Sequence, residues 1–193
     1  MDYTLAIRGT DERTIPGGTG VLLLHPSTGE TDRIDTDFLK TDTDRFLVVS
    51  TRTTAREVLQ KLDYYDVDEE RAVILDTLSI ERGYSRRKTD RISYVSAPDD
   101  LDGVVEQAAR FLEESDGKRR VSVDSITELA YYAGDDPTFD AVERLLELLD
   151  DHDAVGLFHL SPEVHPDELV DRYRDRFDAI IELKEDGSVT LEV

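Results

Sequence analysis

Cysteine is absent from this 193-residue chain, and long apolar runs are absent too. The lack of cysteine excludes disulfide bonds, thiolate metal sites and cysteine catalysis. No apolar stretch approaches the roughly 20 residues that a membrane-spanning helix needs, so we expect no membrane partner. The first residues, MDYTLAIRGTDERT, also lack the charged-then-apolar pattern of a secretory signal. These absences predict a cytoplasmic protein.

Basic residues are scarce, and lysine most of all. The chain has 45 Asp and Glu against 23 Lys and Arg, for a formal net charge of −22, and only five of the basic residues are lysine. Such a composition is typical of proteins that work in molar salt, where the Debye length falls to about 3 Å and self-repulsion is screened. It therefore favours a halophilic source over the alternative, an acidic interaction protein. It also disfavours nucleic acid as a partner, because phosphate binding rests on Lys and Arg.

Apolar runs of strand length alternate with amphipathic segments from Val21 to the C-terminus. Several of these runs are continuous, as expected for strands covered on both faces. The expected strands cover residues 21–24, 46–50, 72–76, 92–96, 120–124 and 154–160. The tail adds two strand-like runs around Asp186-Gly187, a strong hairpin signal. We therefore expect one α/β domain over residues 1–193, with a three-layer, mostly parallel sheet, helices on both faces and a C-terminal antiparallel hairpin.

Helix signals lie between these runs. Apolar residues at helical spacing mark residues 55–62 and 101–112. In the stretch DDPTFDAVERLLELLDD, Asp136 is the expected N-cap and Pro137 the expected first helical residue. A later helix is expected to begin in the same way at Pro166.

The stretch LLLHPSTGET, residues 22–31, follows the first apolar run, where an open α/β sheet binds its ligands. A phosphate loop reads Gly-x-x-x-x-Gly-Lys-[Ser/Thr]. The chain keeps Gly29 and Thr31 but has Leu24 at the first glycine and Glu30 at the lysine. At about 4 Å and an effective dielectric of about 20, one unit-charge interaction amounts to about 4 kcal/mol, so Glu30 disfavours phosphate by several kcal/mol before salt screening. Alone, the stretch indicates an ordinary strand-to-helix turn.

Four blocks of the chain follow one another in a familiar order. They are IPGGTGVLLLHPSTGETDRIDTDFL, RFLVVSTRTTAREVLQKL, RRVSVDSITELAYY and AVGLFHLSPEVHPDELVDRYRDRFDAIIELKEDGSVTLEV. The first block resembles the lead-in, first strand and phosphate loop of the RecA/KaiC-like ATPase family. The second resembles that family's next strand and helix, and the third resembles its Walker B strand. The fourth resembles its late strand, helix and closing hairpin. The resemblance covers nearly the whole chain.

The resemblance implies a RecA-like fold that binds and hydrolyses ATP with Mg²⁺. It assigns the vestigial nucleotide site to Ser27, Thr28, Gly29, Glu30, Thr31 and Asp124. Thr31 and Asp124 would hold the metal only if a Mg-nucleotide binds. Two catalytic features of the family are missing, because Glu30 replaces the lysine and residues 50–53 offer no carboxylate as general base. We therefore expect no catalytic residue and no firmly assigned cofactor, in a degenerate member from a halophilic archaeon.

Other groups have simpler interpretations. His159 and His165 could approach each other at a strand end, but no carboxylate-flanked metal spacing is evident among the histidines, which also include His25 and His152. Asp124 has an alternative role as the cap of the helix at Ser125. The run of Asp150, Asp151 and Asp153 is expected to be a solvated helix end.

One segment reverses the local charge, with Tyr84 interleaved. Its basic residues are Arg82, Arg86, Arg87, Lys88 and Arg91. Arginine pairs with carboxylates and phosphates in a bidentate manner, so these residues are candidates for binding a protein partner. The alternative is pairing with the acidic surface of the same chain.

Three functions stay open on these grounds. The first is a RecA/KaiC-like regulatory or signalling protein that binds nucleotide weakly or not at all and acts through a protein partner or self-association. The second is a working ATPase or ATP-binding switch that uses Thr31, Asp124 and a substitute cation such as Arg33. The third is an enzyme that acts on a small anionic ligand at the strand ends.

Overall fold

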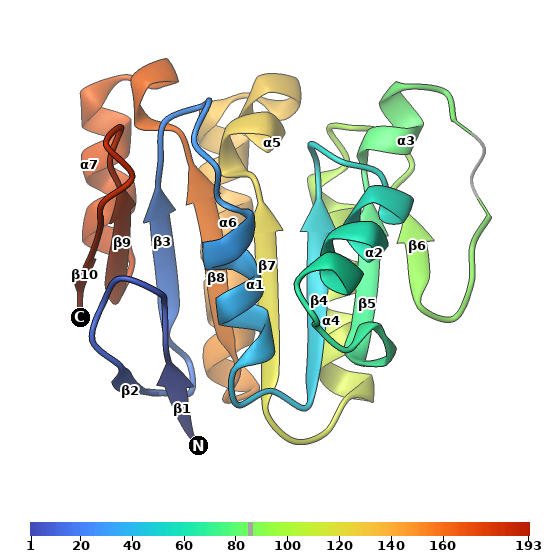
Figure 1. The fold of residues 1–193 in the computed structure, drawn as a ribbon. Coiled ribbons are helices and arrows are strands. Elements are labelled where there is room, and N and C mark those ends of the chain that lie inside the picture. Colours follow the sequence, from blue (N-terminus) through green and yellow to red (C-terminus); the bar gives the residue numbers. More distant parts are fainter. Residues whose placement is uncertain (85–86) are drawn as a thin grey trace.

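A computed structural model describes residues 1–84 and 87–193. It contains an eight-stranded sheet with helices on both faces and a separate two-stranded hairpin at the N-terminus (Figure 1). The strands are β1 (Asp2–Leu5), β2 (Arg13–Pro16), β3 (Gly20–Leu24), β4 (Arg45–Ser50), β5 (Ala72–Asp76), β6 (Ile92–Tyr94), β7 (Arg119–Asp124), β8 (Val155–Leu160), β9 (Ala179–Leu183) and β10 (Val189–Glu192). The helices are α1 (Asp32–Lys40), α2 (Ala55–Tyr64), α3 (Leu78–Glu81), α4 (Leu101–Glu114), α5 (Ile126–Ala133), α6 (Asp135–Asp151) and α7 (Asp167–Arg176), with short 3-10 turns η1 (Glu69–Arg71) and η2 (Pro162–Val164).

The sheet order is β10-β9-β3-β8-β7-β4-β5-β6. All neighbours pair in parallel except β9 and β10, which form the antiparallel C-terminal hairpin. The predicted three-layer α/β fold and its closing hairpin are therefore confirmed. Gly187 takes a positive φ of 81° in the hairpin turn, a conformation that glycine adopts without strain.

The core lies on both faces of the sheet, which explains the continuous apolar strands. Successive side chains of a strand point to opposite faces. Leu22 and Leu24 therefore pack against α4, α5, α6 and α7, while Val21 and Leu23 pack against α1, α2 and the β1–β2 hairpin. Figure 1 shows the two helical layers in front of and behind the sheet.

The strand order creates a crevice between β4 and β7. The chain passes outward from β4 to β5 and β6, then returns through α4 to β7 and continues in the opposite direction to β8. Such a switch point in a doubly wound sheet is where ligands bind, outside the carboxyl ends of the strands. The residues that follow β3, β4 and β7 meet around this crevice.

The N-terminal hairpin was missed by the sequence prediction. Strands β1 and β2 have four residues each and are joined by a long polar connection, so neither shows the continuous apolar pattern of the main sheet. Their apolar residues nevertheless enter the front core, where Tyr3, Leu5 and Ile15 are fully buried.

Two predicted helix starts are wrong by one residue or more. Helix α6 begins at Asp135 with Gly134 at the N-cap, so Asp136 is not the cap and Pro137 lies inside the first turn. The first-turn N–H groups have no partner within a helix, so proline is tolerated there. Helix α7 begins at Asp167, with Pro166 at the N-cap position.

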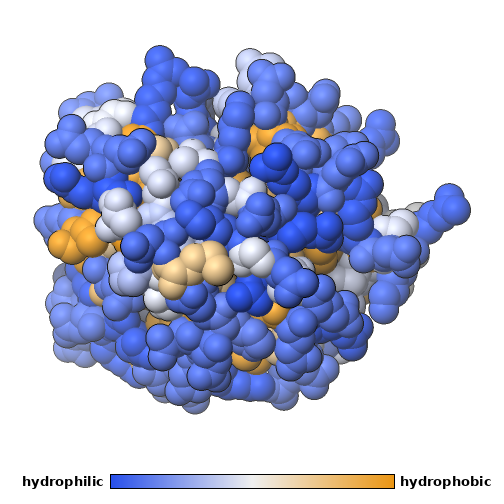
Figure 2. Space-filling view, turned by 90° about the horizontal axis from the view of Figure 1, so that it is seen from below, coloured by the Kyte–Doolittle hydropathy of each residue, from blue (hydrophilic) through white to orange (hydrophobic). Residues whose placement is uncertain are grey.

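The surface reflects the composition. Seen from the amino ends of the strands, it is mostly hydrophilic, with apolar residues scattered singly or in small groups (Figure 2). Within residues 1–84 and 87–193, no helix combines the length and the apolar character needed to cross a bilayer.

Tyr173 offers a test of the packing on α7. Its ring packs against Phe139 at a centroid distance of 5.0 Å, but its buried hydroxyl has no hydrogen-bond partner among the described residues. We expect Tyr173→Phe to raise the free energy of unfolding by about 1 kcal/mol, because it removes an unsatisfied polar group. Denaturant midpoints measured in molar KCl test this. As a control, Tyr3→Phe should lower stability by about 1 kcal/mol, since the Tyr3 hydroxyl donates to the Asp153 carbonyl at 2.9 Å. A loss of stability in the Tyr173 variant would contradict the prediction.

Candidate functional site

The loop between β3 and α1 occupies the place of a phosphate loop. The N–H of Gly29 donates to the carbonyl of Pro26 at 2.7 Å and closes a tight turn. A Cβ at position 29 would lie 2.9 Å from that carbonyl oxygen, so the turn needs a glycine here. Thr31 is buried at the N-cap of α1, yet its hydroxyl makes no capping hydrogen bond. Gly29 therefore has a steric reason to be present in this turn.

A carboxylate that follows the neighbouring strand β8 accepts a hydrogen bond from this loop. The backbone N–H of Ser27 donates to the Glu163 side chain, which η2 carries after β8. Burial would raise the pKa of Glu163, but the Ser27 N–H lowers it below its ordinary value. A backbone N–H of the kind that holds phosphate in a phosphate loop is thus already used by an acidic side chain.

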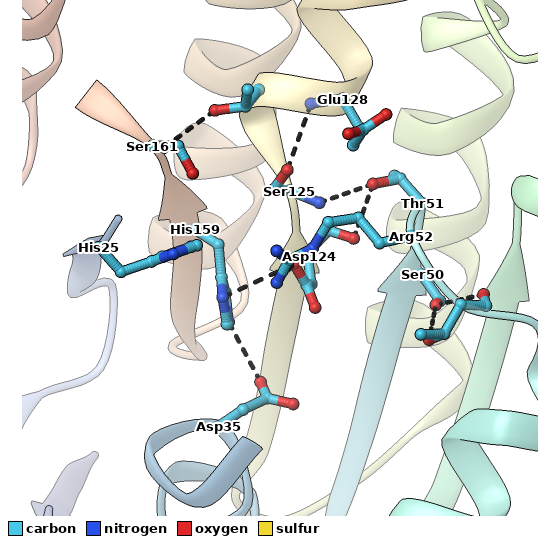
Figure 3. A network of polar contacts seen from close by, with 12 residues as sticks. His25, Asp35, Ser50, Thr51, Arg52, Asp124, Ser125, Glu128, His159 and Ser161 are labelled. Atoms are coloured by element: carbon cyan, nitrogen blue, oxygen red, sulfur yellow. Dashed lines mark hydrogen bonds and ion pairs between the residues drawn. The ribbon is translucent and has the colours of Figure 1, made fainter. Parts of the chain in front are cut away.

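Asp124, at the end of β7, forms an ion pair with Arg52, which follows β4. The guanidinium nitrogen lies 2.6 Å from the carboxylate oxygen (Figure 3). Thr51 fixes the backbone beneath this pair, since its hydroxyl donates to the Asp124 carbonyl at 2.7 Å and accepts from the Ser125 N–H at 2.7 Å. The pair links the segments that follow the carboxyl ends of β4 and β7. Asp124 does not cap α5; that role belongs to the Ser125 hydroxyl, which accepts from the Glu128 N–H.

A second ion pair lies below the first and is buried more deeply. Lys61 of α2 lies 2.7 Å from Asp35 of α1, whose side chain is 1% exposed. Ser122 of β7 donates to the other carboxylate oxygen at 2.6 Å. Burial alone would raise the pKa of Asp35, but the Lys61 ammonium holds it well below its ordinary value. Burial would lower the pKa of Lys61, and Asp35 raises it above its ordinary value.

His159 connects the two ion pairs. Its ring, fully buried on β8, lies 3.4 Å from Asp35 through Nε2 and 3.6 Å from Asp124 through Nδ1 (Figure 3). His25 packs edge-on against the same ring at 5.5 Å. Burial, and next the neighbouring His159, lower the pKa of His25 to about 4, so His25 is neutral at pH 7. A continuous polar network of five ionisable groups therefore lies beneath the loop, formed by Arg52, Asp124, His159, Asp35 and Lys61.

The loop and this network line a hollow of about 660 Å³, which we call the loop hollow. It is lined by Gly29, Glu30, Thr31, Asp32, Arg33, Arg52, Thr53, Glu57, Lys61, Tyr65 and Asp124. Four carboxylates therefore face three cations, and two of the cations, Arg52 and Lys61, already pair with carboxylates of the chain. This set of groups does not fit a Mg-triphosphate, which needs an excess of positive charge.

The candidate nucleotide residues lie at this hollow to different degrees. Gly29, Glu30, Thr31 and Asp124 line it. Ser27 and Thr28 are exposed on the same loop, and Ser27 binds Glu163 instead. Glu57, the first carboxylate after β4, also lines the hollow, but its side chain accepts from the Thr54 N–H and hydroxyl at 2.8 Å each, as half of a capping box.

The sequence interpretation missed most of the network. Asp35 lies among the apolar residues Ile34 and Phe38, and His159 is the one polar residue in the run AVGLFHL. A charged or imidazole side chain within a buried pattern is the signal that indicates a partnered polar group. Lys61 carries no such signal, because it lies on α2 and reaches Asp35 only through the fold.

The histidines provide no metal site among the described residues, where no group of three or more His, Asp or Glu is placed to hold a metal ion. His159 and His165 have different partners. His165 bonds to Thr127 at 3.0 Å and lies 3.6 Å from Asp135. Of the acidic run, Asp150 and Asp151 are exposed, whereas Asp153 binds the N-terminal ammonium and is not simply solvated.

The basic segment lies at the sheet edge formed by β6. Arg82, Arg87, Lys88 and Arg91 are all exposed, and Arg86 lies outside the described residues. Arg91 donates to the Glu69 carbonyl at 2.9 Å. Within residues 1–84 and 87–193, none of the four forms an ion pair with a carboxylate. The alternative of pairing with the acidic surface of the same chain therefore has no support in the described part.

Solved structures of similar fold include an ATPase. A type III secretion system ATPase of pathogenic bacteria superimposes with a TM-score of 0.65 at 13% identity over 98% of this chain, which spans 60% of that ATPase. A KaiC-like protein from the hyperthermophilic archaeon Pyrococcus horikoshii gives 0.58 at 17% identity, covering 92% of this chain and 80% of the other. A further protein of that organism, solved in complex with an unknown peptide, gives 0.64 at 12% identity, with coverages of 92% and 83%. These likenesses show a RecA/KaiC-like fold.

The sequence comparisons give a narrower result. No curated protein matches the chain. One family model matches it from residue 1 to residue 193, over the full length of the sequence. The chain therefore belongs to the family described as "Family of unknown function (DUF7090)".

Proposed function

We propose that this chain is a RecA/KaiC-like regulatory or signalling protein that has lost ATP hydrolysis and acts through protein contacts, either with a partner or with a second copy. The observation that carries the proposal is the Arg52–Asp124 ion pair at 2.6 Å. In the family that the sequence resembles, Asp124 would direct magnesium and a glutamate after the second strand would serve as the base. In this chain Arg52, two residues after the end of β4, is the cation that pairs with Asp124.

Three further features support the loss of catalysis. Glu30 replaces the lysine and faces the loop hollow. Glu163 holds the Ser27 N–H. Glu57 is engaged in the cap of α2, and the sequence offers no carboxylate from residue 50 to residue 53. Each feature places a negative charge where a triphosphate needs a donor, or removes a group that hydrolysis needs. The acidic, lysine-poor composition supports a cytoplasmic role in a halophilic archaeon.

Calorimetric titration with Mg-ATP and a phosphate-release assay, both in molar KCl, test the proposal. We expect no saturable binding at submillimolar ATP and no turnover. Submillimolar binding by the unaltered chain would overturn the proposal. If that binding also disappeared in Thr31→Ala and Asp124→Ala, it would belong to the loop hollow.

A second candidate function is an ATP-binding switch, and Arg33 favours it. Arg33 lines the loop hollow without a carboxylate partner among the described residues, and its guanidinium lies 6.0 Å from the centre of the Tyr65 ring. A guanidinium in this place could replace the missing lysine as a phosphate ligand. The titration decides between the two functions, because the switch requires submillimolar ATP binding that Arg33→Ala weakens.

A further inference from the structure

Two hollows adjoin along α2, and the first of them shares Arg52 and Glu57 with the loop hollow. The first, of about 670 Å³, lies beyond the carboxyl ends of β4 and β5 and contains Arg52, Arg56 and Arg82. The second, of about 660 Å³, continues toward the sheet edge and contains Leu59 and Ile92. Ala55, Arg56, Gln60 and Tyr94 line both of them. We call the combined surface the α2 groove; its lining residues come from α2, α3 and β6 and from the segments beside them.

The first half of the α2 groove offers free positive charge. Arg56 and Arg82 are exposed and form no ion pair with a carboxylate of the described residues, whereas Arg52 is paired with Asp124. Tyr84 and Tyr94 line the same hollow. Two unpaired arginines in one hollow of a chain with a net charge of −22 suit a carboxylate, which arginine binds through two parallel hydrogen bonds.

The acidic residues of this half are already engaged. Asp76 is buried and accepts from the Ala55 N–H at 2.8 Å, the Ser79 N–H at 2.8 Å and the Ser79 hydroxyl at 2.7 Å. Glu57 is used in the capping box with Thr54. Neither carboxylate forms an ion pair with the two arginines.

The second half of the α2 groove is mainly apolar. Leu59 and Ile92 are half-buried, and both pack against the front core from the groove side. Arg87 lines this half and is exposed without a carboxylate partner in the described part of the chain. Asp63 and Glu69 also line this half. An occupant therefore meets positive charge first and then an apolar surface that is bordered by one cation and two carboxylates.

We propose that the α2 groove binds an extended segment of a partner protein in which acidic side chains stand beside apolar ones. The acidic side chains pair with Arg56 and Arg82, and the neighbouring apolar side chains lie on Leu59 and Ile92. The proposal rests on the proposed function only in taking the ligand to be a protein. The charge pattern favours this occupant over a phosphate group. A phosphate dianion would lie next to the carboxylates of Glu57 and Asp76, and their repulsion is larger for a dianion than for a single carboxylate.

Fluorescence anisotropy in molar KCl with three labelled peptides tests the proposal. In the first peptide glutamate alternates with leucine, in the second glutamine replaces every glutamate, and in the third serine replaces every leucine. We expect saturable binding of the first peptide and binding weaker by roughly tenfold or more for the other two. Equal binding of all three peptides, or of none, would overturn the proposal, as would displacement of the first peptide by inorganic phosphate or AMP at equal concentration.

Matched variants assign the binding to the α2 groove. Arg56→Ala combined with Arg82→Ala should weaken binding by roughly tenfold or more. Arg8→Ala with Arg110→Ala, which removes the same charge from exposed positions elsewhere, should leave it unchanged. Gln60→Glu should also weaken binding, whereas Gln107→Glu on α4 should not. Loss of binding in the control variants would overturn the assignment.

The ATP titration on the same samples separates this inference from the proposed function. Peptide binding that depends on Arg56 and Arg82, together with submillimolar ATP binding, would refute the proposed function and leave the α2 groove standing. If neither ATP binding nor selective peptide binding is observed, the inference that the α2 groove binds an acidic segment is refuted and the proposed function stands.

Discussion

Lys61→Met is expected to lower the free energy of unfolding by about 3–5 kcal/mol. The substitution keeps the length of the side chain but removes the ammonium that lies 2.7 Å from Asp35. The carboxylate would stay 1% exposed, with Ser122 and His159 as its remaining partners. An uncompensated buried charge is among the few single changes with an effect of this size.

Two companion variants separate burial from charge pairing. Arg144→Met breaks an ion pair of similar length, 2.6 Å to Asp102, but both side chains are well exposed, so the expected loss is below about 1 kcal/mol. Adding Asp35→Asn to Lys61→Met removes the unpaired charge and keeps the shape, so the double variant should recover more than half of the loss. Equal losses for Lys61→Met and Arg144→Met, measured by denaturant unfolding, would show that the buried pair contributes no more to stability than the exposed pair.

The pH dependence of the Lys61→Met variant follows from the direction of each pKa shift. In the unaltered chain the pKa of Asp35 lies below its unfolded value, so its contribution is present above about pH 4 and is lost as pH falls through the folded pKa. Without Lys61, burial is expected to raise the pKa of Asp35 above the unfolded value. The folded variant then takes up a proton before the unfolded chain does, and its deficit relative to the unaltered protein should shrink as pH falls from about 7 to about 4. A constant deficit over this range would contradict the assignment of the loss to Asp35.

The fold could be predicted from the sequence because several of the main strands are continuous apolar runs. Strands such as β4 and β8 are buried on both faces, so residues 46–50 and 155–160 show no polar position apart from their ends and His159. The β1–β2 hairpin could not be predicted in this way, because it lies outside the sheet. The N-cap positions of α6 and α7, at Gly134 and Pro166, depend on local backbone angles that several residue types satisfy equally well.

The candidate site was predictable only in part. Glu30 and Asp124 could be placed by their order along the chain, since the carboxyl ends of parallel strands meet at one edge of a sheet. Their partners could not. Arg52 and Lys61 reach Asp124 and Asp35 across 72 and 26 residues of sequence, and no periodic pattern marks such a pair. Side-chain pairing between elements depends on packing, which a single sequence does not display.

Glu30→Lys is expected to strengthen Mg-ATP binding relative to the unaltered chain, for which we expect no saturable binding at submillimolar ATP. The variant exchanges a repulsive charge at the edge of the loop hollow for an attractive one, next to Thr31 and facing the same space as Asp124. Salt screening in molar KCl reduces the Coulomb gain, so we expect an increase in affinity of about 10- to 100-fold. Calorimetric titration measures it, and Glu12→Lys, at an exposed position of the N-terminal hairpin, makes the same change of net charge away from the hollow.

Adding Glu163→Gln to Glu30→Lys should raise the ATP affinity further, because it weakens the bond that occupies the Ser27 N–H. Turnover should stay absent in both variants, since no carboxylate follows β4 before Glu57 and Arg52 still neutralises Asp124. Binding without hydrolysis would show that the charge at position 30 and the absence of a base after β4 limit ATP binding and hydrolysis separately. If Glu30→Lys binds no better than Glu12→Lys, the obstacle is the geometry of the turn between Pro26 and Gly29, and Glu30 is not the residue that excludes the triphosphate.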